Sequence, residues 1–194
     1  MTQQAVPASS ARVRPVVDPP ADVAALLAKG TKHDGEPLTM MKVLAHRPKV
    51  LRSMISIGGA LWGSGHVGPR ERELAILRSA WRTGCEYEFG HHRLLAPGCG
   101  VTDAEIAATA VLDLDGWTAS DRLLLTAVDE LCVTSRISPS TWSAMAGDWS
   151  EDQLLDLVLL VGTYTLIGMV VGGLDLPREP GVPGWLEADG ADSA

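Results

Sequence analysis

Most side chains capable of chemistry lie in one short stretch of the sequence, residues 68–92. Among its charged and titratable residues are the glutamates Glu73 and Glu88 and the histidine His92. Carboxyl groups and an imidazole that share a protein interior can pass a proton among themselves near neutral pH. The stretch therefore predicts acid/base chemistry, with His92 and Glu88 as the proton-transferring pair and Glu73 orienting His92 or relaying protons.

A helix must place Glu73 on a packed side. Pro69 is typical of a first helical position, and Glu71 then lies in the turn where the helix dipole favours negative charge. Glu73 shares one side of this helix with Leu77 and Ala80, so its carboxylate is expected to be buried. A buried carboxylate needs a partner.

A second helix can supply that partner. Gly84 lets the chain bend, after which Cys85, Glu88 and His92 recur at i, i+3 and i+7 and share one helix face. We expect this face to meet Glu73. Cys85 at a helix N-terminus would gain thiolate character, but a single thiol has no neighbour with which to form an intramolecular disulfide.

The same residues carry a family resemblance. The run RERELAIL followed by W-x-x-G-x-E-Y-E-x-G-H-H resembles the carboxymuconolactone decarboxylase branch of the alkylhydroperoxidase AhpD-like superfamily. The peroxidase branch carries a glutamate, a C-x-x-C pair and a histidine, and Glu73, Cys85 and His92 match three of these positions. Glu88 replaces the remaining cysteine, which favours the decarboxylase side. The similarity extends more loosely over residues 37–183.

The resemblance implies an all-α, AhpD-like helical bundle that forms homo-oligomers, with a trimer or hexamer as the family's habit. We expect a mobile tail at 1–17, one domain at 18–176 and a C-terminal arm at 177–194. The implied function is cofactor-independent decarboxylation or proton transfer on a small carboxylated or lactone substrate. Glu73 and His92 are catalytic by resemblance, whereas Glu88 is argued from its helix face.

Two alternatives remain open. The first is a thiol-dependent alkylhydroperoxidase-like redox protein, for which Cys85, Tyr87, His91 and Trp81 are possible pocket or redox residues. The second is a non-catalytic scaffold subunit of the same fold, in which Glu73 and His92 form a buried structural pair. His91 points about 100° away from His92 and is expected at a surface or an interface.

Composition narrows the classes of partner. The net charge of −8 disfavours nucleic acid. The three cysteines match neither a zinc site nor a disulfide framework. A single E-x-x-H, at residues 88–91, falls short of a di-iron ligand set, so no metal is predicted. The N-terminal residues show no secretory signal, and a cytoplasmic location is expected.

The rest of the chain reads as further helices. Capping boxes at Thr102 and Ser150 predict two helix starts, and residues 31–36 read as a polar connection. Apart from Thr163, Tyr164 and Thr165, the run 157–174 is apolar and long enough to span a membrane. Its glycines and polar centre instead favour a helix shared between the core and a subunit interface.

Overall fold

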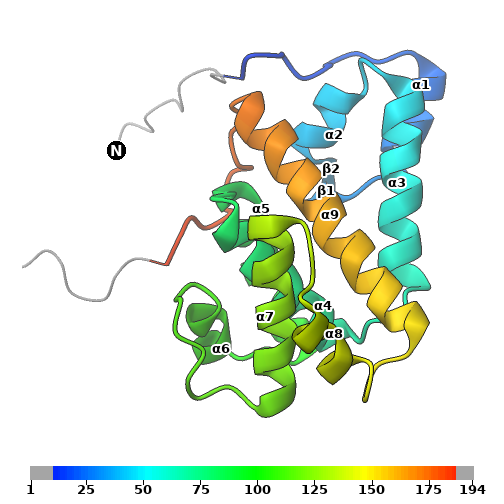
Figure 1. Ribbon diagram of the computed structural model, residues 1–194. Helices are drawn as coiled ribbons and strands as arrows, with labels where there is room; N and C mark the ends of the chain where they lie inside the picture. The colour runs from blue at the N-terminus through cyan, green and yellow to red at the C-terminus, as the bar shows by residue number, and fades with distance from the viewer. Residues whose placement is uncertain (1–10, 187–194) are drawn as a thin grey trace, which may run out of the picture. The chain divides into compact units, whose positions relative to one another are not determined.

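The computed structural model describes residues 11–186, and this part of the chain is mostly helical (Figure 1). The elements in chain order are α1 (Ala21–Leu27), β1 (Lys32–His33), β2 (Glu36–Pro37), α2 (Thr39–Leu44), α3 (Pro48–Gly63), α4 (Pro69–Arg82), α5 (Glu86–Leu95), η1 (Ala96–Cys99), α6 (Asp103–Ala108), α7 (Ala119–Thr134), α8 (Pro139–Met145) and α9 (Glu151–Gly173).

Contacts divide the chain into two compact units, each described here by itself. The first comprises the residues up to Ser64 together with Met169–Gly181. The second comprises Gly65–Gly168 together with the residues from Val182 onwards. Whether residues 18–176 behave as one domain stays a prediction.

The first unit contains the departure from an all-α fold. Strands β1 and β2 pair antiparallel, with His33 opposite Glu36. Asp34 and Gly35 between them have φ of 48° and 83°. Positive φ at both central residues is typical of the tight hairpin turn that Asp-Gly sequences favour. The polar residues 31–36 therefore form a hairpin, and the expected all-α fold is mostly but not entirely helical.

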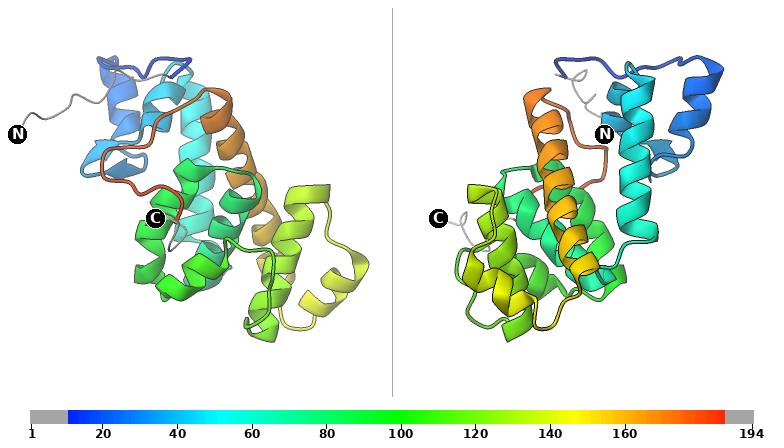
Figure 2. Two further views of the ribbon diagram at one scale, coloured as in Figure 1. Left: turned by 90° about the vertical axis from the view of Figure 1, so that its left-hand side faces the viewer. Right: turned by 45° about the vertical axis from the view of Figure 1, so that its right-hand side comes forward.

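The helices of the first unit pack through apolar side chains. Figure 2 shows α1 and α2 lying alongside α3, and both helices contact it. Their buried apolar residues, with Leu51 of α3, are Val23, Leu26, Leu27, Met40, Met41 and Val43.

Part of the predicted N-terminal tail is held by this unit. Arg12 donates through its backbone N–H to the carbonyl of Leu174 at 2.8 Å and through its guanidinium to that of Gly173 at 3.0 Å. The backbone N–H of Val16 donates to Lys42 at 3.1 Å. Residues 11–17 are thus fastened rather than free, and residues 1–10 lie outside the described part of the chain.

The second unit is built on α4, which packs against both α5 and α7 (Figure 1). As predicted, α4 begins at Pro69 and ends before Gly84, whose φ is 68°. The backbone N–H of Cys85 donates to Ala80 and that of Gly84 to Trp81, so a Schellman motif closes the helix. The core contains fully buried side chains from all three helices, among them Leu74, Leu77, Phe89, Leu124, Leu125 and Val128.

A buried arginine ties α4 to α7. Arg78 has an exposed fraction of 0% and donates to both carboxylate oxygens of Asp129, at 2.7 and 2.6 Å. It also donates to the carbonyl oxygens of Thr109 and Val111 in the segment after α6. The guanidinium therefore donates hydrogen bonds to the backbone carbonyl groups of an irregular segment as well as to a carboxylate. A buried charge requires such partners.

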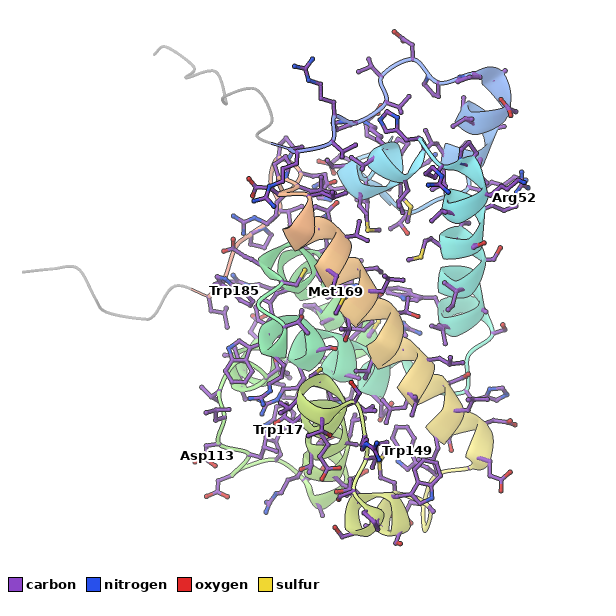
Figure 3. The ribbon with its side chains drawn as sticks, turned by 45° about the horizontal axis from the view of Figure 1, so that its top comes forward. Arg52, Asp113, Trp117, Trp149, Met169 and Trp185 are labelled. Carbon is purple, nitrogen blue, oxygen red and sulfur yellow. The ribbon has the colours of Figure 1, made fainter. Side chains whose placement is uncertain are left out.

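The C-terminal segment 182–186 lies on α5, where Figure 3 labels Trp185. The rings of Trp185 and Phe89 have centroids 5.0 Å apart, and the Trp185 backbone N–H donates to Glu86 at 2.9 Å. A side chain at Gly90 would overlap the carbonyl oxygen of Pro183, so only glycine admits this approach. The end of the predicted arm, 187–194, lies outside the described residues.

Helix α9 opens with the predicted capping box, in which the Gln153 backbone N–H donates to Ser150 Oγ at 3.2 Å. Among the described residues it is the one helix long and apolar enough to cross a membrane by length and composition, a weak signal that core helices also give. Its exposed large apolar side chains are Leu155, Val158, Leu159, Leu166 and Met169.

Candidate functional site

Three predicted residues of the second unit meet in one buried cluster. His92 Nδ1 lies 2.7 Å from Glu73 Oε2, and His92 Nε2 lies 3.5 Å from Glu88 Oε2. The exposed fractions of Glu73, His92 and Glu88 are 0%, 4% and 6%. The imidazole is thus placed between two carboxylates in an environment with almost no water.

This placement alters the protonation of His92. Burial alone lowers the pKa of a histidine, but here the hydrogen bonds to Glu73 and Glu88 and their negative charges outweigh it. The pKa of His92 rises to about 9. At neutral pH the ring is therefore an imidazolium, and Nδ1–H donates to Glu73. The cluster holds a proton that it can donate and take back.

Local sequence signals set this geometry. Pro69 fixes the start of α4 and so places Glu73 one turn into the helix. Gly84 reverses the chain, and Cys85 becomes the N-cap of α5. Glu88 and His92 are four residues apart and project from the same side of α5, next to α4. The predicted face of the second helix does meet Glu73.

Cys85 borders the cluster as a buried thiol. Its exposed fraction is 7%. Gly168 of α9 packs closely against it, so that a methyl group at Gly168 would lie 3.4 Å from the Cys85 Cβ. Burial, together with the negative charge of Glu88, raises the pKa of the Cys85 thiol to about 11. This opposes the thiolate character that its helix-terminal position suggested.

Sequence reasoning missed two residues of this site. Arg72, with an exposed fraction of 7%, places Nε 3.4 Å from Glu73 Oε1. Tyr164 of α9 meets the His92 ring edge-on, with centroids 5.0 Å apart at 82°. Arg72 could have been found because it is a basic residue next to a carboxylate that was expected to be buried. Tyr164 could have been found because it is a polar residue within the apolar run of α9.

The other predicted pocket residues lie elsewhere in their helices. Tyr87 is buried and packs on His91, with ring centroids 4.5 Å apart. His91 Nδ1 lies 2.8 Å from the carbonyl oxygen of Tyr87. Trp81 lies beneath the guanidinium groups of Arg78 and Arg82, whose carbons are 4.7 and 5.7 Å from its ring centroid. Trp81 thus belongs to the arginine cluster of α4.

Within residues 11–186, no group of three or more histidine, cysteine, aspartate or glutamate side chains has the arrangement of a metal site. The site offers a row of contacts in which Arg72 and His92 donate hydrogen bonds to Glu73, and His92 forms an ion pair with Glu88.

Comparison with known proteins gives a family match for the segment that carries the cluster. Residues 48–129, which carry this cluster, match the model of the Carboxymuconolactone decarboxylase family. Solved structures described as AhpD-like and peroxidase-related share the fold. Over these residues the chain is similar to that family, and the solved structures share its AhpD-like fold. No curated protein matches it.

Three solved structures show how far this fold extends. An uncharacterised peroxidase-related protein from Silicibacter sp. TM1040 is 12% identical, with 94% of this chain and 97% of that chain covered and a TM-score of 0.78. An uncharacterised peroxidase-related protein from Ralstonia eutropha JMP134, described as an alkylhydroperoxidase AhpD core, is 18% identical, with 91% and 95% covered and a TM-score of 0.76. A variant of the debrominase Bmp8, in complex with 2,3,4-tribromopyrrole, is 12% identical, with 87% and 91% covered and a TM-score of 0.73.

At these identities the likeness shows the fold alone. It confirms the AhpD-like helical fold over most of the chain. The reaction and the substrate must be argued from the cluster itself.

Proposed function

We propose that this chain is a cofactor-independent acid/base enzyme acting on a small carboxylated or lactone substrate. The observation that carries the proposal is the buried imidazolium of His92, held between two carboxylates 2.7 and 3.5 Å away. A general acid must hold a proton at the working pH and lie near a base. The pKa of His92 is raised to about 9, and its Nε2 lies 3.5 Å from Glu88 Oε2.

Decarboxylation is the reaction we favour for this pair. When a carboxylate leaves as CO₂, the electrons of the broken C–C bond pass into an adjacent carbonyl and form an enolate. A cationic hydrogen-bond donor in a water-poor site stabilises such a charge, and we assign this role to His92 Nε2–H. A proton delivered from His92 or Glu88 to carbon then completes the reaction. In this scheme Glu73 keeps the imidazole oriented.

The thiol-dependent alternative is less well supported. Glu88 occupies the position at which the peroxidase pattern has a cysteine, and burial and Glu88 raise the pKa of Cys85 to about 11. At neutral pH the thiol is therefore protonated, whereas a thiolate is the nucleophile that attacks a peroxide. Peroxidase-related names belong to structural neighbours whose likeness concerns the fold.

The central experiment measures CO₂ release from carboxymuconolactone and related small lactone acids by the wild-type chain. Replacing Glu88 by Gln, or His92 by Asn, should lower the rate by about a hundredfold or more, as expected for general acid/base groups. Glu86→Gln is the matched control, because Glu86 lies on the same helix and contacts Trp185. The control should keep the wild-type rate.

The alternatives give different results in the same assays. A scaffold predicts no turnover by the wild-type chain, with Glu73 and His92 variants that lose only stability. A thiol peroxidase predicts peroxide consumption with a dithiol reductant, abolished by Cys85→Ser. We expect little such consumption, and Cys85→Ser should keep most of the decarboxylase activity. Robust peroxide turnover that depends on Cys85 would refute the proposed function.

A further inference from the structure

The two carboxylates beside His92 are not equivalent. Glu73 contacts two cationic groups, with Oε1 3.4 Å from Arg72 Nε and Oε2 2.7 Å from His92 Nδ1. Within residues 11–186, the cationic group that contacts Glu88 is His92, whose Nε2 lies 3.5 Å from Oε2. The cluster is therefore asymmetric, with an arginine on the Glu73 side.

Arg72 is a permanent charge in this interior. A guanidinium does not lose its proton in proteins, and burying it is costly unless a carboxylate lies next to it. Arg72 has an exposed fraction of 7%, and its terminal nitrogen also lies 3.8 Å from Cys99 Sγ in η1. Contacts on two elements thus hold the guanidinium against Glu73.

We propose that Arg72 is a positioning residue that holds the Glu73 carboxylate against Nδ1 of His92, so that the mobile proton of the site passes between His92 Nε2 and Glu88. This rests on the proposed acid/base function, since it names the atom and the carboxylate that such chemistry uses. Arg72 itself does not touch the reacting atoms.

The assignment follows from which nitrogen keeps its proton. A charged Glu73 accepts the Nδ1–H of His92 whether the ring is cationic or neutral. Neutral His92 then carries its proton on Nδ1 and a lone pair on Nε2, directed to the Glu88 side. Among the described residues, the Tyr164 ring of α9 meets His92, and the Cys85 thiol lies beside Glu88.

Nitrogen NMR on protein labelled in its histidines measures this proton directly. The chain has five histidines, and the His92 signals are those missing from His92→Asn. Titration of the wild type upward through the pKa of about 9 should leave neutral His92 in the Nδ1–H tautomer. A neutral His92 protonated on Nε2 would overturn the inference without any variant being made.

Arg72→Gln tests the role of the charge. Without it, neutral His92 should lose its preference for Nδ1–H, and its titration midpoint should rise by about one pH unit, because a nearby positive charge has been removed. Arg72→Lys restores the charge and should restore both observations. Arg70→Gln removes a charge from the same helix, where Arg70 pairs with Asp121, and should change neither.

Each result decides the matter. A folded Arg72→Gln with the wild-type tautomer and midpoint would overturn the inference. If Arg72→Gln does not fold, the wild-type tautomer and the Arg72→Lys titration decide in its place. The measurement also separates the two proposals, because it needs no turnover. A wild-type chain with no activity refutes the proposed function, whereas the wrong tautomer refutes the role of Arg72.

Discussion

Stability should fall as pH rises through the titration of His92. The pKa of His92 is raised from 6.5 to about 9 in the folded chain. Between these values the folded state binds a proton that the unfolded state has released, so the free energy of unfolding decreases with pH. The contribution is fully present below 6.5 and is lost as pH rises through about 9. His92→Asn should remove it.

The size of this effect follows from the two pKa values. One pKa unit corresponds to about 1.4 kcal/mol, so the interval from 6.5 to about 9 corresponds to about 3 kcal/mol. That is a large share of the total stability expected for a domain, which is about 5–15 kcal/mol. The Cys85 thiol adds a further loss only at higher pH, because its pKa is raised from 9.0 to about 11.

Urea unfolding at several pH values from 6.5 to about 9 provides the measurement. The wild type should lose about 3 kcal/mol more than His92→Asn over this range. Asn is chosen because its amide can still donate to Glu73. Parallel pH dependence in the two proteins would refute the reasoning, as would a wild type that becomes more stable toward alkaline pH.

Three further predictions concern packing and assembly. Gly90→Ala should cost about 1–3 kcal/mol of stability in urea unfolding, because its methyl group would overlap the carbonyl oxygen of Pro183. Asp129→Ala should cost about 3 kcal/mol by the same measurement, since it leaves the buried guanidinium of Arg78 without its carboxylate. We also propose that chains associate through the exposed apolar side of α9. Sedimentation equilibrium should then give a mass above 20.5 kDa that Leu159→Glu lowers, and a monomeric wild type would contradict this.

Much of the site could be predicted because its signals are local. Pro69 and Gly84 mark the two ends of α4 by backbone rules that depend little on tertiary context. The spacing of Glu88 and His92 then fixes their common face on α5. The contact of that face with Glu73 was predicted because burying a carboxylate without a partner is costly.

What could not be predicted depends on contacts between distant segments. Arg72 precedes Glu73 directly, and adjacent helical residues normally point in different directions. Its guanidinium lies between Glu73 and Cys99 of η1, and the packing of η1 against α4 cannot be read from local sequence. Tyr164 is about seventy residues from His92 in sequence, and no periodicity links them. The hairpin at 32–37 could have been predicted from local sequence, because Asp34-Gly35 is typical of a tight hairpin turn.

The alkylation rate of the buried Cys85 thiol measures how often the packing around the site opens. Glu73, His92 and Glu88 have exposed fractions of 6% or less, so the surrounding helices shield them from solvent. Cys85 lies beside Glu88 and under Gly168 of α9, and it is shielded by the same packing. Its rate of alkylation in the native protein is therefore set by how often this packing opens. The ratio of this rate to the alkylation rate of the unfolded chain gives the free energy of that opening. This free energy sets an upper limit on how often a ligand can enter the site.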